Sequence, residues 1–135
     1  MPDNFPYLLG VDFGLKKVGL AIATIRLASP YKTMKYKSMD SLISQIALIC
    51  KEENIQKIVV GISEGDMAEK TRRFIQKLKD KVIIQVVEFD ETLSTQDAQR
   101  LSFEAGIKRS KRKNLEDAMA ATVMLQNYID SSKLT

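Results

Sequence analysis

The stretch LLGVDFGLKKVGLAIA, residues 8–23, decides the fold, and it contains a charged residue, Asp12, inside an otherwise apolar run. Two strand-like segments, residues 7–13 and 18–23, flank the tetrapeptide GLKK. Apolar runs joined by a short turn of this kind predict a β-hairpin. The question is why a carboxylate lies in the first strand of that hairpin.

Asp12 has two possible roles at this position. Alternate residues of a strand share a face, so Asp12 lies with Gly10 and Gly14, opposite Leu9, Val11 and Phe13. The two glycines would leave space for a ligand, and ligands of open α/β sheets bind at the carboxyl ends of strands, where Asp12 falls. The alternative is that Asp12 only caps the GLKK turn through a side-chain hydrogen bond.

The composition excludes several classes of protein. A chain of 135 residues is expected to form one domain, residues 1–135. Because it has neither a long apolar run nor the features of a signal peptide in its start, MPDNFPY, we expect a cytoplasmic protein with no membrane partner. The absence of histidine excludes Ser-His and Cys-His nucleophile pairs. The single cysteine, Cys50, lies among apolar residues at helical spacing and is expected to fill the core.

The rest of the chain alternates extended and helical segments. With the hairpin it predicts an α/β fold, a mixed five-stranded sheet flanked by helices with right-handed crossovers. The other strands are expected near residues 29–37, 58–62 and 81–89. Helices are expected at residues 39–53, capped by Asp40 or Ser41, and at about 66–78, 94–104 and 114–129.

Two further acidic positions resemble that of Asp12. Asp90 and Glu91 follow a predicted strand, and Asp117 lies near the start of the last predicted helix. With Asn114 as the N-cap, Asp117 would occupy the third helical position, where a carboxylate is favoured for structural reasons alone. Acids that converge from distant parts of a chain repel one another unless a cation lies between them. Hard oxygen ligands without histidine or cysteine indicate Mg²⁺ or Mn²⁺.

The positive charge of the chain is local. Residues 108–113 read KRSKRK, and without these five basic residues the remaining 16 nearly balance 17 acidic ones. The run is expected to form a loop between the last two helices. It is either an ordinary solvated loop or a strip that contacts phosphates.

Four motifs in this order and spacing resemble those of the YqgF/RuvX family: VDFGLKKVGLAIA, IVVGI, FDETLST and DAMAATVMLQ. The resemblance spans residue 8 to about residue 129. That family is identified with Holliday-junction resolvases of the ribonuclease H-like fold and is also linked to trimming of precursor 16S ribosomal RNA. Carried over by position, its acidic residues fall on Asp12, Glu91 and Asp117. Ala120 and Ala121 are small enough to let the last helix lie close to the sheet.

The chain also departs from the family pattern. Thr92 stands where the family usually has an arginine, and residues 63–65 replace a proline and a longer glycine-containing loop. A phosphate contact is therefore missing. Either the basic run or Arg72 and Arg73 take it over, or this member has an altered substrate preference or reduced activity. Glu64 is a possible further metal ligand from its place after a strand.

The resemblance implies metal-assisted hydrolysis of a phosphodiester. Asp12, Glu91 and Asp117 would hold two divalent ions, Mg²⁺ or Mn²⁺, roughly 4 Å apart. The nucleic-acid backbone would be held by basic residues of the hairpin turn and of the run KRSKRK, namely Lys16, Lys17, Lys108, Arg109, Lys111, Arg112 and Lys113.

Several functions stay open at this point. The implied activity is an endonuclease that processes the 5′ end of precursor 16S rRNA, or a Holliday-junction resolvase acting on branched DNA. A non-catalytic nucleic-acid-binding protein with the same fold is the third possibility, favoured by Thr92. An actin-like ATPase would need a second domain, and a P-loop ATPase would need a G-x-x-x-x-G-K-[ST] motif that the chain lacks. Phosphate contacts do not distinguish RNA from DNA, and nothing in the sequence indicates an oligomeric state.

Overall fold

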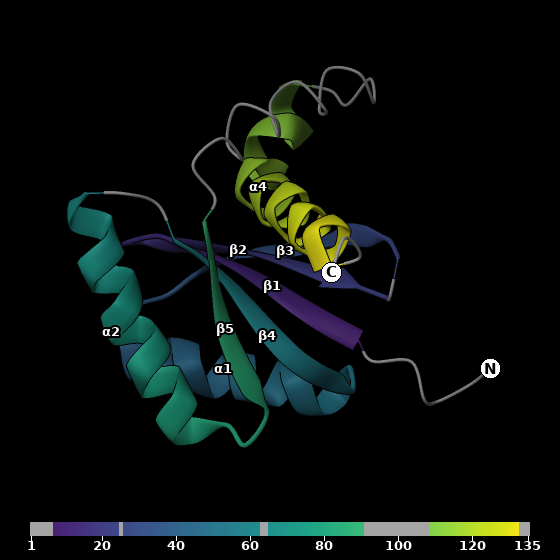
Figure 1. Cartoon of the computed structure of the whole chain (residues 1–135). Helices are drawn as coiled ribbons and strands as arrows, with labels where there is room; N and C mark the ends of the chain where they lie inside the picture. The colour runs from purple at the N-terminus through teal and green to yellow at the C-terminus, as the bar shows by residue number, and fades with distance from the viewer. Residues whose placement is uncertain (1–6, 25, 63–64, 91–108, 133–135) are drawn as a thin grey trace.

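A mixed sheet forms the centre of the molecule (Figure 1). The computed structural model describes residues 7–24, 26–62, 65–90 and 109–132, with the backbone alone for residues 109–115 and 132. Within these residues, five strands pair in the order β3-β2-β1-β4-β5. β1 pairs antiparallel with β2 and parallel with β4, which confirms the predicted mixed sheet. The strands are β1 (Tyr7–Phe13), β2 (Lys17–Ala23), β3 (Ala28–Lys35), β4 (Ile55–Ile62) and β5 (Gln85–Asp90).

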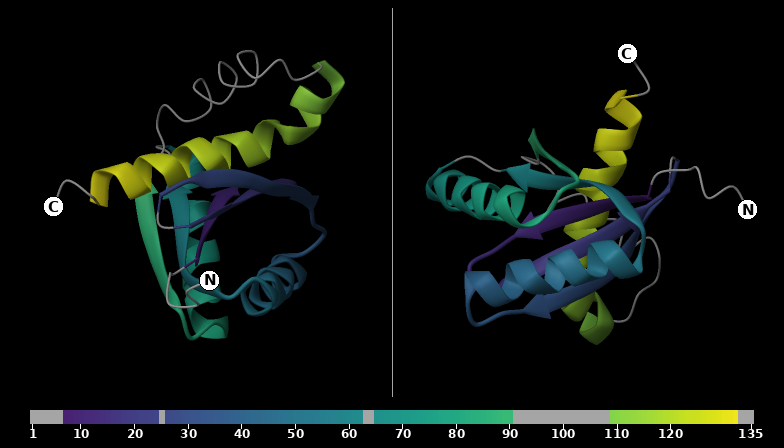
Figure 2. Two further views of the ribbon diagram at one scale, coloured as in Figure 1. Left: turned by 90° about the vertical axis from the view of Figure 1, so that its right-hand side faces the viewer. Right: turned by 90° about the horizontal axis from the view of Figure 1, so that it is seen from below.

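Helices cover both faces of this sheet (Figure 2). α1 (Met39–Glu52) and α2 (Asp66–Lys81) lie on one face. On the opposite face α4 (Arg109–Ser132) crosses β1, β2 and β3. None of the helices in the described part of the chain is long and apolar enough to span a membrane.

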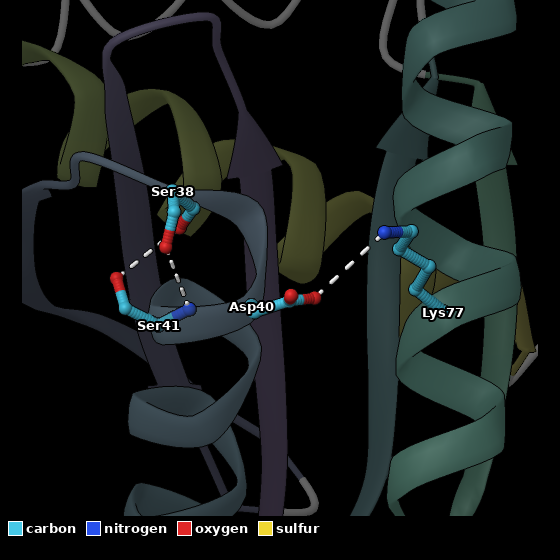
Figure 3. A network of polar contacts seen from close by, with 4 residues as sticks. All are labelled: Ser38, Asp40, Ser41 and Lys77. Carbon is cyan, nitrogen blue, oxygen red and sulfur yellow. Dashed lines mark hydrogen bonds and ion pairs between the residues drawn. The ribbon is translucent and has the colours of Figure 1, made fainter.

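α1 begins at Met39 as predicted, but its N-cap is a different residue. Ser38, rather than Asp40 or Ser41, is the N-cap, and its Oγ accepts a hydrogen bond from the backbone N–H of Ser41 at 3.1 Å (Figure 3). Asp40 instead points toward α2, where its Oδ1 lies 3.7 Å from Lys77 Nζ. The residue before a helix can accept from its exposed N–H groups, whereas one inside the first turn cannot reach them as well.

Two helix boundaries were predicted wrongly. α2 continues to Lys81, so β5 begins at Gln85 rather than near residue 81. α4 begins at Arg109, so most of the run KRSKRK is helical and not a loop. Lysine and arginine are good helix formers, and their charge says nothing about whether a segment is helical. The helix predicted at residues 94–104 lies outside the described residues.

Candidate active site

Asp12 lies at the carboxyl end of β1, on the face of the sheet that α4 covers. In the strand register its Cα pairs with Gly19 of β2 on one side and with Gly61 of β4 on the other. Its side chain is half-buried. No side chain is therefore present at the positions directly beside the carboxylate on either neighbouring strand. This pairing was not predicted, although a hairpin register drawn from the GLKK turn pairs Asp12 with Gly19.

Gly10 and Gly14, the glycines on either side of Asp12 in the sequence, leave space that the rest of the protein fills. A Cβ atom built on Gly10 would lie 3.0 Å from Leu125 Cβ of α4, and one on Gly14 would lie 2.6 Å from the Lys17 carbonyl oxygen. The space that these two glycines leave is thus taken by α4 and by the hairpin turn. The expectation that it would admit a ligand was wrong.

α4 brings Asp117 to the same place. A Cβ atom on Gly19 would lie only 1.9 Å from the carbonyl oxygen of Asp117, so the helix backbone rests directly on β2 at this point. Because Gly19 is the cross-strand partner of Asp12, the two aspartates come from distant parts of the sequence to one region of one face. Ala121, one of the two alanines expected to let this helix lie close to the sheet, is fully buried in the cluster between α4 and the sheet, whereas Ala120 is buried in a separate cluster.

Asp117 does not lie at a helix start. It lies eight residues after Arg109, the first residue of α4, which is about two turns inside the helix. The capping-box interpretation with Asn114 as the N-cap was therefore wrong. The helix-dipole argument for a carboxylate at the first turn no longer explains Asp117.

A lysine of the hairpin lies beside this carboxylate. Lys17 Nζ is 3.5 Å from Asp117 Oδ2, with half of the lysine side chain and about a third of the aspartate side chain exposed (50% and 35%). Lys16, the preceding residue, is exposed in the turn. Both lysines therefore lie at the same end of the sheet as Asp12, as the sequence predicted.

Aromatic packing fixes the hairpin turn. The Tyr36 hydroxyl donates a hydrogen bond to the Gly14 carbonyl, and the Tyr36 N–H donates to the Lys16 carbonyl at 3.3 Å. Burial raises the pKa of Tyr36, so its hydroxyl stays protonated as a donor at neutral pH. Phe13 stacks between Tyr36 and Phe74, with ring centroids 6.2 and 4.6 Å away. Asp12 and Lys17 thus flank a turn that is anchored in the core.

The donor set fits a hard divalent cation. The side chains of Asp12 and Asp117 offer only carboxylate oxygens, the ligands that Mg²⁺ and Mn²⁺ prefer. Within the described residues, no group of three acidic or cysteine side chains surrounds one point. Glu91, the third predicted ligand, lies outside these residues, as does Glu64. β5 ends at Asp90, which pairs with Ile62 at the same edge of the sheet.

The basic run lies on the same helix as Asp117. Arg109, Lys111, Arg112 and Lys113 form the first turns of α4, and Lys108 lies outside the described residues. One helix therefore carries both the basic positions and the candidate carboxylate. Thr92, the departure from the family pattern, also lies outside the described residues.

The two arginines that could replace the missing phosphate contact have different surroundings. Arg73 forms an ion pair within its own helix, with Nη2 3.0 Å from Glu69 Oε1. Arg72 lines a cavity of about 590 Å³ at the carboxyl ends of β4 and β5, and its Nε is 3.9 Å from Glu88 Oε1. Of the two arginines, only Arg72 lines this cavity.

Cys50 is a core residue and not a candidate nucleophile. It is buried in the core on α1, and burial raises the pKa of its thiol to about 11. A thiol with that pKa is protonated at neutral pH and is a poor nucleophile. This confirms that Cys50 fills the core.

Comparison with known proteins identifies one family over nearly the whole chain. The family model described as "RuvX: Holliday junction resolvase" matches residues 6–131. A protein of Endomicrobium trichonymphae provisionally named a pre-16S rRNA nuclease is 39% identical over 132 residues, covering 91% of this chain and 94% of the relative. A relative from Caldanaerobacter subterraneus with the same provisional name is 37% identical and covers 93% of this chain and 97% of its own.

Solved structures confirm the ribonuclease H-like fold. RuvC of Thermus thermophilus, solved with a Holliday junction substrate, superposes with a TM-score of 0.61 at 11% identity and covers 95% of this chain and 96% of its own. The Holliday junction resolvase of fowlpox virus gives 0.61 at 15% identity, covering 93% and 99%. At these identities the likeness concerns the fold alone.

Proposed function

This chain belongs to the RuvX family, and from that membership and the geometry of Asp12 and Asp117 we propose that it is a metal-dependent endonuclease acting on structured nucleic acid. Its substrate is precursor 16S rRNA, which it processes at the 5′ end during ribosome biogenesis. The names of the relatives from Endomicrobium and Caldanaerobacter support this choice. The second candidate substrate is a Holliday junction, supported by the description of the matching family model.

One observation carries the site. α4 lies directly on Gly19, the cross-strand partner of Asp12, and so delivers the carboxylate of Asp117 to the face and the strand end that carry Asp12. A helix held at this distance by contact with the sheet backbone fixes both carboxylates on rigid elements, as a metal site requires. We propose that Glu91, one residue after the end of β5, completes the set.

Each group of residues has a separate task in the proposed reaction. Asp12, Asp117 and Glu91 would hold Mg²⁺ or Mn²⁺, which supplies a Lewis acid for the phosphodiester and lowers the pKa of the attacking water. Carboxylates alone would repel a phosphate backbone. The basic positions of α4 and the two lysines of the hairpin turn offset that repulsion and hold the strand over the site. Arg72, facing the cavity beside β5, provides a further phosphate contact.

Replacing Asp12 tests this proposal. The Asp12→Asn variant keeps the size of the side chain but loses a charged metal ligand, so we expect cleavage to fall at least about a hundredfold, while binding of nucleic acid is retained. The measurement is cleavage of end-labelled precursor rRNA and of a four-way DNA junction, side by side, with Mn²⁺ and with chelator. Binding is followed by gel shift.

The matched control is Asp80→Asn, an exposed aspartate of α2 on the other side of the sheet, which should cleave like the wild type. Cleavage by Asp12→Asn near the wild-type rate would remove Asp12 from the site. Binding of both substrates without cleavage of either by the wild type would contradict the endonuclease proposal and favour a binding protein.

A further inference from the structure

The ion pair between Lys17 and Asp117 places an ammonium group at the proposed metal site. β2 alternates between the two faces of the sheet: Val18 and Leu20 are buried in the core with α1 and α2, whereas Gly19 and Ala21 face α4. Lys17 is in step with Gly19 and Ala21, so the pleat directs its side chain to the face of Asp12 and Asp117. The position of this cation thus follows from the strand register.

The pair is weak enough to exchange. Its closest atoms are 3.5 Å apart, and both side chains are partly exposed. Pairs of this kind contribute little to stability because water screens the charges and two flexible side chains must be ordered. A divalent ion carries twice the charge of an ammonium group and can accept several oxygen ligands at once.

From this geometry we infer that Lys17 is a competing cation built into the metal site. In the metal-free protein its ammonium group neutralises Asp117. Lys17 leaves Asp117 when a divalent ion binds, and it is then free to contact a phosphate of the nucleic acid from the same end of the sheet. The inference rests on the proposed function, because it assumes that Asp117 is a metal ligand.

Competition with Lys17 lowers the affinity of the site for the metal ion. The ion must displace the lysine, so the apparent affinity is lower than the carboxylates alone would give. Removal of the lysine charge should therefore tighten metal binding, whereas a stronger competitor should weaken it. A lysine that only fastened α4 to β2 would change the stability of the fold and leave metal affinity unchanged.

The experiment is titration of the full chain with Mn²⁺, followed by calorimetry and by the shift in thermal midpoint between chelator and Mn²⁺, at low salt. We expect Lys17→Gln to lower the Kd for Mn²⁺ about two- to fivefold, the range of a weak ion pair. The matched control is Lys16→Gln, which removes the same charge from the neighbouring turn residue and should stay close to the wild-type Kd.

A second variant distinguishes competition with the metal ion from a general effect on folding. Lys17→Arg keeps the charge and pairs with a carboxylate through two parallel N–H groups, so it should raise the Kd for Mn²⁺. The difference between Lys17→Gln and the wild type should shrink at high salt, because the pair is screened. Equal Kd values for wild type, Lys17→Gln and Lys17→Arg would overturn the inference while leaving the metal site standing. No binding of Mn²⁺ to the wild type would instead contradict the metal site itself.

Discussion

The two faces of the sheet are built in opposite ways. On the face under α1 and α2, large apolar side chains fill the space between helix and sheet, among them the fully buried Phe74, Leu42 and Ile46. On the face under α4, the buried residues that β2 and β3 contribute are small and the helix backbone touches β2 at Gly19, while larger side chains of α4 such as Met124 and Leu125 pack elsewhere on this face. On the first face side chains separate helix and sheet, and on the second the two backbones meet at Gly19.

This difference explains where the candidate site lies. A thick layer of apolar side chains stabilises the fold but keeps polar groups of the helix far from the sheet. A helix in backbone contact carries its own carboxylate to a carboxylate of the strand, as Asp117 reaches the region of Asp12. We call the face under α1 and α2 the thick face and the face under α4 the thin face. Changes on the thick face should mainly affect stability, and changes on the thin face should mainly affect activity.

The largest expected effect is on the thick face. Phe74 is fully buried and stacks on Phe13, so Phe74→Ala should lower the free energy of unfolding by about 3–5 kcal/mol. The measurement is urea unfolding. Leu48→Ala, at an exposed position of α1, is the control and should change stability by less than about 0.5 kcal/mol. A loss below about 1 kcal/mol for Phe74→Ala would show that this face is not the main source of stability.

A smaller loss of stability but a larger loss of function is expected on the thin face. Gly19→Ala places a methyl group against the carbonyl of Asp117, and backbone cannot move aside as a side chain can, so α4 must shift. We expect about 1–3 kcal/mol of destabilisation and a loss of cleavage by the folded protein. Gly10→Ala mainly meets the side chain of Leu125 and should have a milder effect on both. Full cleavage by Gly19→Ala would mean that the close approach of α4 is not needed for activity.

Much of this arrangement could be predicted from local patterns, whereas some helix boundaries and the contacts between distant residues could not. The face of the sheet on which Asp12 lies follows from the alternation of residues along one strand. The wholly apolar run of residues 58–62 is likewise typical of a strand inside a sheet, and β4 lies between β1 and β5. The helical state of the run from Arg109 could not be inferred from charge, because a solvated loop and an exposed helix turn look alike in composition. The role of Gly19 depends on a contact across about 100 positions of the chain, which no local pattern contains. The expectation for Glu91 stays a prediction.

The faces should also differ in binding nucleic acid. Changing Lys111, Arg112 and Lys113 of α4 to glutamine should weaken binding about tenfold across sequences and flatten its salt dependence, since counterion release scales with phosphate contacts. The charge-matched control changes Lys77, Lys79 and Lys81 of α2, on the thick face, and should leave the salt slope close to that of the wild type. Equal slopes for both triple variants would show that the basic run of α4 is an ordinary solvated surface.

The smallest expected effect is on stability at Asp117. A like-charge repulsion between Asp117 and Asp12 would make Asp117→Asn stabilising, but Lys17 offsets it, so in chelator we expect a change below about 1 kcal/mol in either direction. Mn²⁺ separates the two roles that Asp117 can have. If it is a metal ligand, saturating Mn²⁺ stabilises the wild type by RT ln(1 + [L]/Kd), about 2.7 kcal/mol at a hundred times Kd, and stabilises the variant much less.

The measurement is thermal unfolding of both proteins with chelator and with Mn²⁺, alongside cleavage of the same labelled substrates. If Asp117 only pairs with Lys17 to fasten α4 to β2, the variant loses a little stability in both buffers and keeps its activity. Equal Mn²⁺ shifts in the two proteins would then remove Asp117 from the metal site, and the contact between α4 and Gly19 would be a feature of packing alone.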